Sequence, residues 1–242
     1  MSGEYENTGF LIKARTESGN YMAFYSSDCG ITGCTPKLDV ELKPAPVAHV
    51  LSNLQDSRLR EGSPDAVFND VRYIDLGGRD GVGGYRDIVL FDLSEFDNAE
   101  SIECADLSLF WYYPAGIERP EDTIVEIYRP ESWNPDYATW NSRDLNTPWV
   151  HPGGDWFDLN NVAQGSTPYA TLTIKGSDVP DNSYHELDVT ELVKAYVSGK
   201  YENTGFLIKA HTESGNYIAF CSSDYEDENK RPVLTVSEIA YV

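Results

Sequence analysis

The sequence predicts an all-β protein, a sandwich or barrel of short strands accompanied by one short helix. Nine runs between residues 72 and 239 are rich in β-branched and aromatic residues and are bounded by Gly, Pro, Asn or Asp. Such runs are typical of strands, and so many of them in one chain favour two packed sheets or a closed barrel. The nine predicted strands are 72–76, 87–92, 105–113, 123–128, 169–175, 184–189, 205–210, 216–222 and 233–239.

The run Ala105–Tyr113 alternates as expected of a strand with one buried face. Its apolar face, predicted to lie in the core, consists of Ala105, Leu107, Leu109, Trp111 and Tyr113. The opposite face carries Phe110 and Tyr112. These two rings either lie beneath a loop, which we favour because sandwiches shield apolar faces, or form an exposed aromatic platform.

The single helix is predicted over Thr190–Ser198. Asp188 can cap its start, with Glu191 three residues further on, and Gly199 can end it. Its buried stripe is predicted to consist of Leu192, Val193, Tyr196 and Val197.

The connection between the strands 205–210 and 216–222 contains the run Thr-Glu-Ser-Gly-Asn. This composition predicts a hairpin turn over Thr212–Asn216, because Gly215 or Asn216 can adopt the positive φ that such turns require. The two flanking strands are therefore expected to be neighbours.

The charge balance excludes several classes of partner. The chain has 40 Asp and Glu against 18 Lys and Arg, a formal net charge of −22, and no stripe of basic residues. Such a surface repels polyanions, so nucleic acid is excluded as a partner. The longest apolar runs, Ile88–Phe91 and Leu107–Tyr113, are far shorter than the ~20 residues that cross a bilayer, so no membrane span is predicted.

Four cysteines in 242 residues do not make a disulfide scaffold. Cys29 and Cys34 flank a short turn-rich segment and either close a small disulfide loop or stay free. Cys104 and Cys221 are isolated and the four histidines are scattered, which disfavours zinc.

An internal repeat is the most informative feature of the chain. Residues 2–28 match residues 198–224 at a constant offset of 196, with identical residues at 23 of 27 positions. We interpret 1–43 as the C-terminal strands of a preceding module, 44–49 as a Pro-rich linker and 50–242 as a complete module. Because the first copy begins within a module, we expect the chain to be an excised fragment of a tandem array, without its signal peptide.

A tryptophan-rich segment is the first candidate binding site. Four of the five tryptophans lie between residues 131 and 160, among Pro, Gly, Asn and Asp. Indole faces can stack on sugar rings while carboxylates and amides bond the hydroxyl groups. The proposed carbohydrate-binding residues are Trp149, Trp156, Trp133 and Asp155. The alternative is that these tryptophans anchor a long loop to the sandwich, which we favour for Trp140.

Two acidic segments are candidate calcium sites. The first is the Gly-rich segment 75–87, with Asp75, Asp80 and Asp87, and the second is 224–228, with Asp224 and Asp227. Hard cations prefer several oxygen ligands, which acidic and Gly-rich loops supply. Neither segment has the EF-hand pattern, and a solvated acidic loop is the alternative for each.

The sequence contains no motif for catalysis. There is no Gly-x-Ser-x-Gly segment, and 40 carboxylates make close acidic pairs uninformative. We therefore expect a non-catalytic module.

Several segments together resemble a known family. They are Asp56–Glu61, Arg86–Ser94, Ala105–Leu109, Ala138–Asn141, Leu187–Val193, Asn203–Leu207 and Arg231–Val236. With these segments the chain resembles the DNRLRE domain, also called the disaggregatase-related repeat, of methanogenic archaeal surface proteins. The name motif is present as Asp-Ser-Arg-Leu-Arg-Glu, one residue different. The resemblance covers residues 50–240, and the partial copy at 4–43 is similar to the last strands of the domain.

This resemblance implies a jelly-roll-like β-sandwich, similar to carbohydrate-binding modules and exported in tandem arrays that are sometimes attached to enzymes acting on envelope polysaccharide. It implies no catalytic residues, and the matched motifs look structural, with Asp188 as a helix cap and Trp140 as an anchor.

We therefore expect a non-catalytic carbohydrate-binding module, located extracellularly or at the cell surface, whose partners are an envelope polysaccharide and neighbouring repeat modules. If the polysaccharide is acidic, the net charge opposes binding, so a bridging Ca²⁺ or a local arginine must reverse the sign at the site. The alternatives are a structural or adhesive spacer module and, third, a polysaccharide-degrading domain.

Overall fold

A computed structural model describes residues 11–12, 22–28, 30–33, 35–37, 45–114 and 119–239 of the chain. The chain divides into two units, residues 1–42 and 43–242, which are described separately. In the first unit, none of the described residues lies in a helix or strand. The large apolar side chains described there are exposed, and they are Leu11, Ile12, Met22, Phe24, Tyr25 and Ile31. Cys29, Cys34 and most of the repeated segment 5–25 lie outside the described residues.

The described part of the second unit contains fourteen strands, one α-helix and one 3₁₀ helix. In chain order they are β1 (Val47–Leu51), β2 (Leu54–Arg60), β3 (Tyr73–Arg79), β4 (Gly83–Phe91), β5 (Ile102–Tyr113), β6 (Thr123–Pro130), β7 (Ser142–Asp144), β8 (Thr147–Pro148), β9 (Trp156–Phe157), β10 (Ala170–Ile174), β11 (Tyr184–Asp188), α1 (Thr190–Val197), β12 (Phe206–Ala210), β13 (Ile218–Cys221), η1 (Glu228–Lys230) and β14 (Val233–Glu238).

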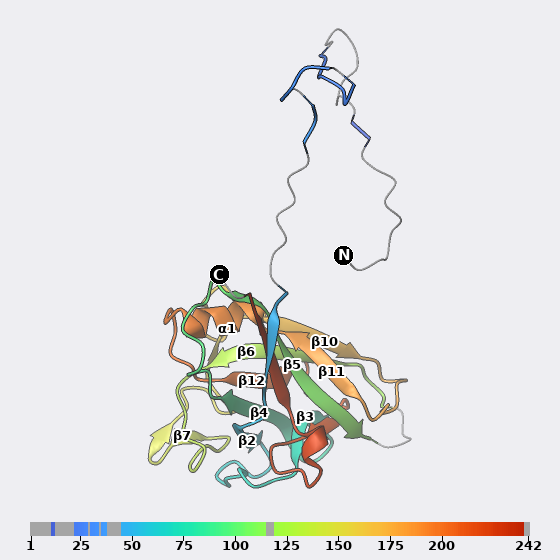
Figure 1. Cartoon of the computed structure of the whole chain (residues 1–242). Helices are drawn as coiled ribbons and strands as arrows, with labels where there is room; N and C mark the ends of the chain where they lie inside the picture. Colours follow the sequence, from blue (N-terminus) through green and yellow to red (C-terminus); the bar gives the residue numbers. More distant parts are fainter. Residues whose placement is uncertain are drawn as a thin grey trace. The chain divides into compact units, whose positions relative to one another are not determined.

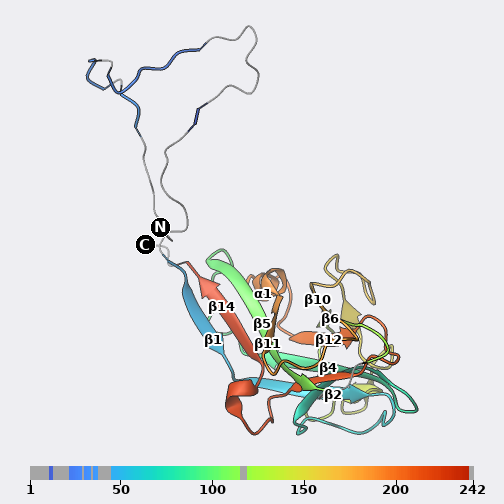
Figure 2. The same ribbon diagram turned by 90° about the vertical axis from the view of Figure 1, so that its right-hand side faces the viewer.

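The strands form two antiparallel layers packed face to face (Figures 1 and 2). The first layer has the order β1-β14-β5-β11, with β13 also paired to β5. The second layer has the order β2-β4-β12-β6-β10. This arrangement confirms the predicted all-β, jelly-roll-like sandwich with one short helix.

Strand β3 belongs to both layers. Its first half pairs with β13, and its last three residues, from Gly77 to Arg79, pair with β4. Gly77 has a φ of +87°, and a Cβ at this position would lie 2.6 Å from the backbone oxygen of Asn216. The glycine therefore permits both the bend and the close approach that carry β3 from one layer into the other.

Strands β1 and β14 are antiparallel neighbours at the edge of the first layer. Val47 lies opposite Glu238 at one end of the pair, and Leu51 lies opposite Leu234 at the other. Residues 47–49, which we expected in the linker, are therefore part of a strand. This expectation was wrong because pairing with the apolar β14 stabilises the Val-Ala-His run, which the preceding prolines made resemble a linker.

The main core lies between the two layers, and α1 closes one end of it (Figure 2). Leu192, Val193 and Tyr196 of α1 belong to this core, as predicted. The N-cap residue is Val189 rather than Asp188. The Asp188 carboxylate instead accepts a hydrogen bond from the backbone N–H of Thr190 at 3.0 Å, and the side chain and backbone of Thr190 together lower the pKa of Asp188.

All nine predicted strands are present, with boundaries shifted by a few residues. The predicted hairpin over Thr212–Asn216 is wrong, because β12 lies in the second layer and β13 in the first. This segment crosses between layers, although Gly215 has the expected positive φ of 66°. Phe110 is buried beneath Tyr184 and the Lys230 ammonium, as favoured, whereas the half-buried Tyr112 stacks on Tyr73. Among the described residues, no helix combines the length and apolar character needed to span a bilayer.

Candidate functional site

A second apolar cluster lies on the outer face of the second layer. Because side chains alternate along a strand, Ile88 and Leu207 point away from the core that their neighbours Val89 and Ile208 fill. Residues 131–165, which we call the tryptophan loop, supply two tryptophans to this cluster, Trp140 and Trp149, and two more that pack against it, Trp133 and Trp156.

Three tryptophans of this loop act as anchors. Trp140 and Trp149 are buried in the cluster, and the Trp149 indole N–H donates to the Thr139 carbonyl at 2.9 Å. The half-buried Trp133 donates to the Thr204 carbonyl at 2.9 Å, which ties the loop to the segment before β12. Trp149 is only 4% exposed, so it presents no open indole face to a ligand. Of the two interpretations that the sequence allowed for Trp149, anchor or binding residue, its burial favours the anchor.

Trp156 occupies a different position, in the wall of a cavity of about 410 Å³. Its half-buried ring lies 5.6 Å from the Tyr128 ring, and its indole N–H donates to the Gly165 carbonyl at 3.0 Å. The cavity, which we call the Trp156 pocket, is lined by Glu131, Arg143, Thr147, Pro148, Val150, His151, Asp155, Trp156, Phe157, Ala163 and Gln164. Two aromatic rings and several polar side chains therefore meet in one concave site.

Asp155 fixes the shape of this pocket. Its carboxylate accepts hydrogen bonds from the backbone N–H groups of Val150 and His151, at 2.6 and 3.0 Å, and from the Gln164 amide at 3.0 Å. It also contacts the His151 Nδ1 at 2.7 Å. These partners occupy both carboxylate oxygens, so Asp155 organises the loop and has little capacity left for a ligand.

Other polar groups of the pocket keep binding capacity. Arg143 donates from one terminal nitrogen to the Ser132 carbonyl at 2.9 Å and is the only Arg or Lys among the described residues that line the pocket. Gln164 donates through its amide nitrogen, and no described residue donates to its carbonyl oxygen. Neither residue could be identified from the sequence, because the position of each in the pocket depends on how the loop folds back on itself.

Beneath Trp156 lies a layer of paired charges. The Arg86 guanidinium lies 5.4 Å and the Lys209 ammonium 5.6 Å from the Trp156 ring centre, within the range of a cation–π contact. Glu126 contacts Lys209 at 3.3 Å and His211 at 2.7 Å, and the Tyr128 hydroxyl donates to it at 3.1 Å. Burial raises the pKa of Tyr128. Because these groups satisfy one another beneath the loop, they support its fold.

The structure separates the three residues of the first candidate calcium site. Asp75 is buried, pairs with the Arg58 guanidinium and accepts from the Tyr217 hydroxyl at 2.7 Å. Asp87 is also buried, and burial together with the negative charge of Asp56 holds the pKa of Asp87 well above its usual range. Asp80 is exposed in the turn between β3 and β4, so it does not join the other two.

Asp56 completes what we call the buried aspartate cluster, Asp56, Asp75 and Asp87. Sequence reasoning missed Asp56, although the Asp-x-Arg spacing on β2, with Arg58 opposite Asp87, could have indicated it. Both Asp56 oxygens accept from Ser223, through its backbone N–H at 3.0 Å and its hydroxyl at 2.9 Å. Burial nevertheless raises the pKa of Asp56 to about 6.

The second candidate set lies elsewhere on the surface. Asp227 caps η1 by accepting from the Asn229 N–H at 3.2 Å and forms an ion pair with Lys230 at 3.2 Å. Asp224 is exposed and its backbone N–H donates to the Ser222 hydroxyl at 3.1 Å. In the part of the chain that the structure describes, no three His, Cys, Asp or Glu side chains are grouped to hold a metal ion. Calcium binding thus stays a prediction from the sequence.

The two layers, the closing helix and the loop-covered outer face define a β-sandwich repeat module. Comparison with known protein families matches residues 1–40 and 56–236 to the disaggregatase related repeat domain. The chain therefore belongs to the disaggregatase related repeat domain family, which confirms the resemblance seen in its sequence. A search of curated proteins finds no match.

Proposed function

We propose that this module binds polysaccharide without catalysing a reaction, and that the Trp156 pocket is its binding site. The observation that carries this proposal is the half-buried Trp156 indole beside Phe157 in a cavity of about 410 Å³ that also contains Arg143 and Gln164. Ligand sites of this size commonly combine an apolar wall with a few placed polar groups.

The chemistry of the pocket suits a sugar ring. An aromatic face stacks against the C–H face of a sugar, while the Gln164 carbonyl and the Glu131 carboxylate accept from hydroxyl groups. Arg143 supplies the positive charge that a uronate requires in a chain of net charge −22. With Arg143 in the pocket, the proposed polysaccharide ligand can contain acidic sugars, and no Ca²⁺ ion is needed to bridge them to the protein.

The family supports a location for this function. We place the module in a surface protein outside the cell, where neighbouring repeat modules of the same family are its partners. A module without a catalytic site suits that setting, because repeated weak sites on one chain gain avidity for a repetitive polymer.

A structural spacer is the competing function. The anchoring of Trp133, Trp140 and Trp149 favours it, since most of the tryptophan loop serves the fold. The two functions differ in whether the pocket beside Trp156 takes up a ligand.

Affinity gel electrophoresis of the full chain through neutral and uronate-containing polysaccharides tests the proposal. We expect retardation that Trp156→Ala abolishes, and Arg143→Gln to reduce retardation only in the acidic gels. Tyr137→Ala is the matched control, because this exposed aromatic residue of the same loop does not line the pocket. Unchanged mobility of the wild type in every gel would favour the spacer, and release of new reducing ends would indicate an enzyme.

A further inference from the structure

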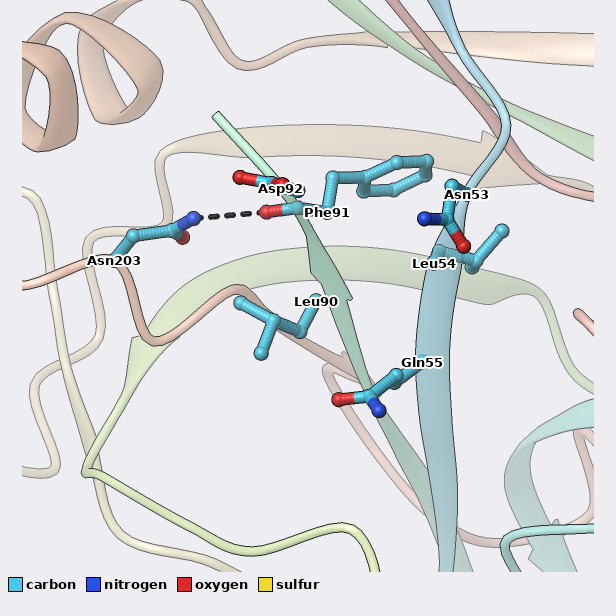
Figure 3. A pocket seen from close by; sticks show the side chains of 7 residues that line it. All are labelled: Asn53, Leu54, Gln55, Leu90, Phe91, Asp92 and Asn203. Atoms are coloured by element: carbon cyan, nitrogen blue, oxygen red, sulfur yellow. Dashed lines mark hydrogen bonds between the residues drawn. The ribbon is translucent and has the colours of Figure 1, made fainter. Parts of the chain in front are cut away.

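A polar groove lies away from the Trp156 pocket, at the end of the second layer where the β1–β2 connection meets the end of β4. Three adjoining cavities of about 320, 310 and 300 Å³ form it, and Asp92 lines all three. Figure 3 shows the first of them. The second extends toward β1 and the third toward α1, so the Asp92 groove is elongated.

Two primary amides line one side of the groove. Gln55 on β2 lies opposite Leu90 on β4, and Asn53 directly precedes β2 in the connection from β1. Both amides border the cavity that Figure 3 shows. Both residues are exposed, and no described residue bonds to either side-chain amide.

Asp92 and Asn203 define the opposite side. The Asp92 Oδ1 accepts from the Ser94 N–H at 2.9 Å, which lowers the pKa of Asp92 and keeps its carboxylate ionised. Asn203 is held in place because its amide donates to the Phe91 carbonyl at 2.8 Å (Figure 3) and its oxygen accepts from the Gly205 N–H at 3.2 Å. Half-buried Leu54 and Leu90 supply apolar surface between these walls.

We propose that the Asp92 groove is a second binding site and that its ligand is a neutral sugar chain. A primary amide offers a donor and an acceptor side by side, which matches a pair of neighbouring sugar hydroxyls, and the Asp92 carboxylate accepts from further hydroxyls. The elongated shape fits a chain of sugars better than a single ring.

The charges of the groove exclude other ligands. Among the described residues, no Arg or Lys lines any of the three cavities, whereas Asp92 lines all three and Glu95 lines the second, so a uronate or phosphate is repelled. A metal ion is disfavoured because the described residues group no three suitable ligands there. This site differs from the Trp156 pocket in lacking an accessible indole and a guanidinium, and its assignment does not depend on the proposed function of that pocket.

A nuclear magnetic resonance titration of the full ¹⁵N-labelled chain separates the two sites. The side-chain amide signals of Asn53 and Gln55 report on the groove, and the Trp156 indole N–H signal reports on the pocket; single alanine variants assign each signal. The probes are cellohexaose, mannohexaose and xylohexaose, with an oligogalacturonate as the acidic comparison. We expect at least one neutral chain to shift both amide signals in a saturable way and the oligogalacturonate to leave them unchanged.

The variant Asn53→Ala with Gln55→Ala should weaken binding of that neutral chain about tenfold, since it removes two amide hydrogen-bonding groups. Thr171→Ala on β10, an exposed change outside the groove, is the matched control and should leave the affinity unchanged. Retained dispersion of the backbone signals shows that each variant is folded.

Each result decides between the two sites. Shifts at the Trp156 indole alone, or no shift with any neutral chain, would overturn the groove proposal. Shifts at the amides alone would support the groove and contradict the function proposed for the pocket. Equal shifts with oligogalacturonate would overturn the selectivity for a neutral ligand.

Discussion

Arg86 and Glu213 form a two-point ion pair, in which Nε donates to Oε1 at 2.7 Å and Nη2 donates to Oε2 at 3.0 Å. The same guanidinium lies 4.9 Å from the Trp140 ring centre and donates to the Gly153 carbonyl at 2.8 Å. One side chain on β4 thereby joins the tryptophan loop to the segment that crosses between the layers.

Replacing Arg86 should loosen this junction. Arg86→Ala leaves the Glu213 carboxylate, only 18% exposed, without its partner, so we expect a loss of about 1–3 kcal/mol in the free energy of unfolding. Arg86→Lys keeps the charge but loses the two-point geometry, so its loss should be smaller. Urea unfolding measures both, and equal stability of the wild type and Arg86→Ala would contradict the role of the pair.

The anchoring tryptophans should affect stability rather than binding. Trp140→Ala and Trp149→Ala each leave a cavity in the outer cluster, so each should cost about 3–5 kcal/mol in urea unfolding. Trp156→Ala, at the pocket wall, should cost less. This predicted order of stability losses would be wrong if Trp149→Ala were as stable as the wild type and reduced glycan binding instead.

The buried aspartate cluster should make stability depend on pH. Asp56 is 3% exposed and has a folded-state pKa of about 6, above the ordinary value, so the folded state holds its proton more tightly than the unfolded state. The protonated Asp56 therefore stabilises the folded state fully below about pH 4. This stabilisation is lost as the pH rises through about 6, which lowers the free energy of unfolding by about 3 kcal/mol. The raised pKa values of Asp75 and Asp87, both caused by burial, act in the same direction.

Asp56→Asn therefore should flatten this part of the pH profile. We expect the free energy of unfolding of the variant to fall less than that of the wild type between about pH 4 and pH 7. Asp70→Asn, at an exposed position, is the control and should follow the wild type. Parallel profiles for Asp56→Asn and the wild type would show that Asp56 does not titrate in this range.

Calcium binding, predicted from the acidic segments, can be measured directly. Of the two sets, Asp224 and Asp227 are the more accessible, so a cation there competes with Lys230 for Asp227. Ca²⁺ at a hundredfold excess over its Kd should raise stability by about 2.7 kcal/mol. Asp227→Asn should reduce that gain. Identical melting curves in calcium and in chelator would exclude the site.

The repeated segment predicts self-association. Leu11, at 90% exposure, corresponds at the offset of 196 to Leu207, which is fully buried in β12. Phe24, at 79%, likewise corresponds to the fully buried Phe220 in β13. Exposed apolar side chains of this kind favour contact with another molecule. We therefore expect dimers that form by strand exchange, and light scattering should report twice the mass of one chain.

A shortened chain beginning at Ala45 lacks these side chains and should be monomeric. If both chains scatter as monomers and melt at the same temperature, the first copy makes no such contact.

The strands that sequence analysis found are those with an uninterrupted apolar face. Strand β5 has an apolar residue at every position of its core face from Ala105 to Tyr113, whereas β2 escaped notice because Asp56 and Arg58 occupy positions that apolar residues usually hold. Its pairing with β4 compensates for that composition, and only the tertiary structure shows this.

The candidate binding site was also predicted only in part from the sequence. Trp149 and Trp156 have similar sequence surroundings, yet one packs into the outer cluster and the other lines a pocket. That difference depends on how the loop folds over β4 and β12, which residue types alone do not specify. The Asp92 groove is also assembled from segments far apart in the sequence.

The pairing of β1 with β14 has a mechanical consequence. Because Val47 lies opposite Glu238, the described chain enters and leaves this module at the same end of one strand pair. Tension applied through these two ends acts across the ladder and opens its hydrogen bonds one after another, starting from that end. A module loaded in this way yields at low force by peeling its edge strand β1, which lengthens the chain before the remaining strands of either layer separate.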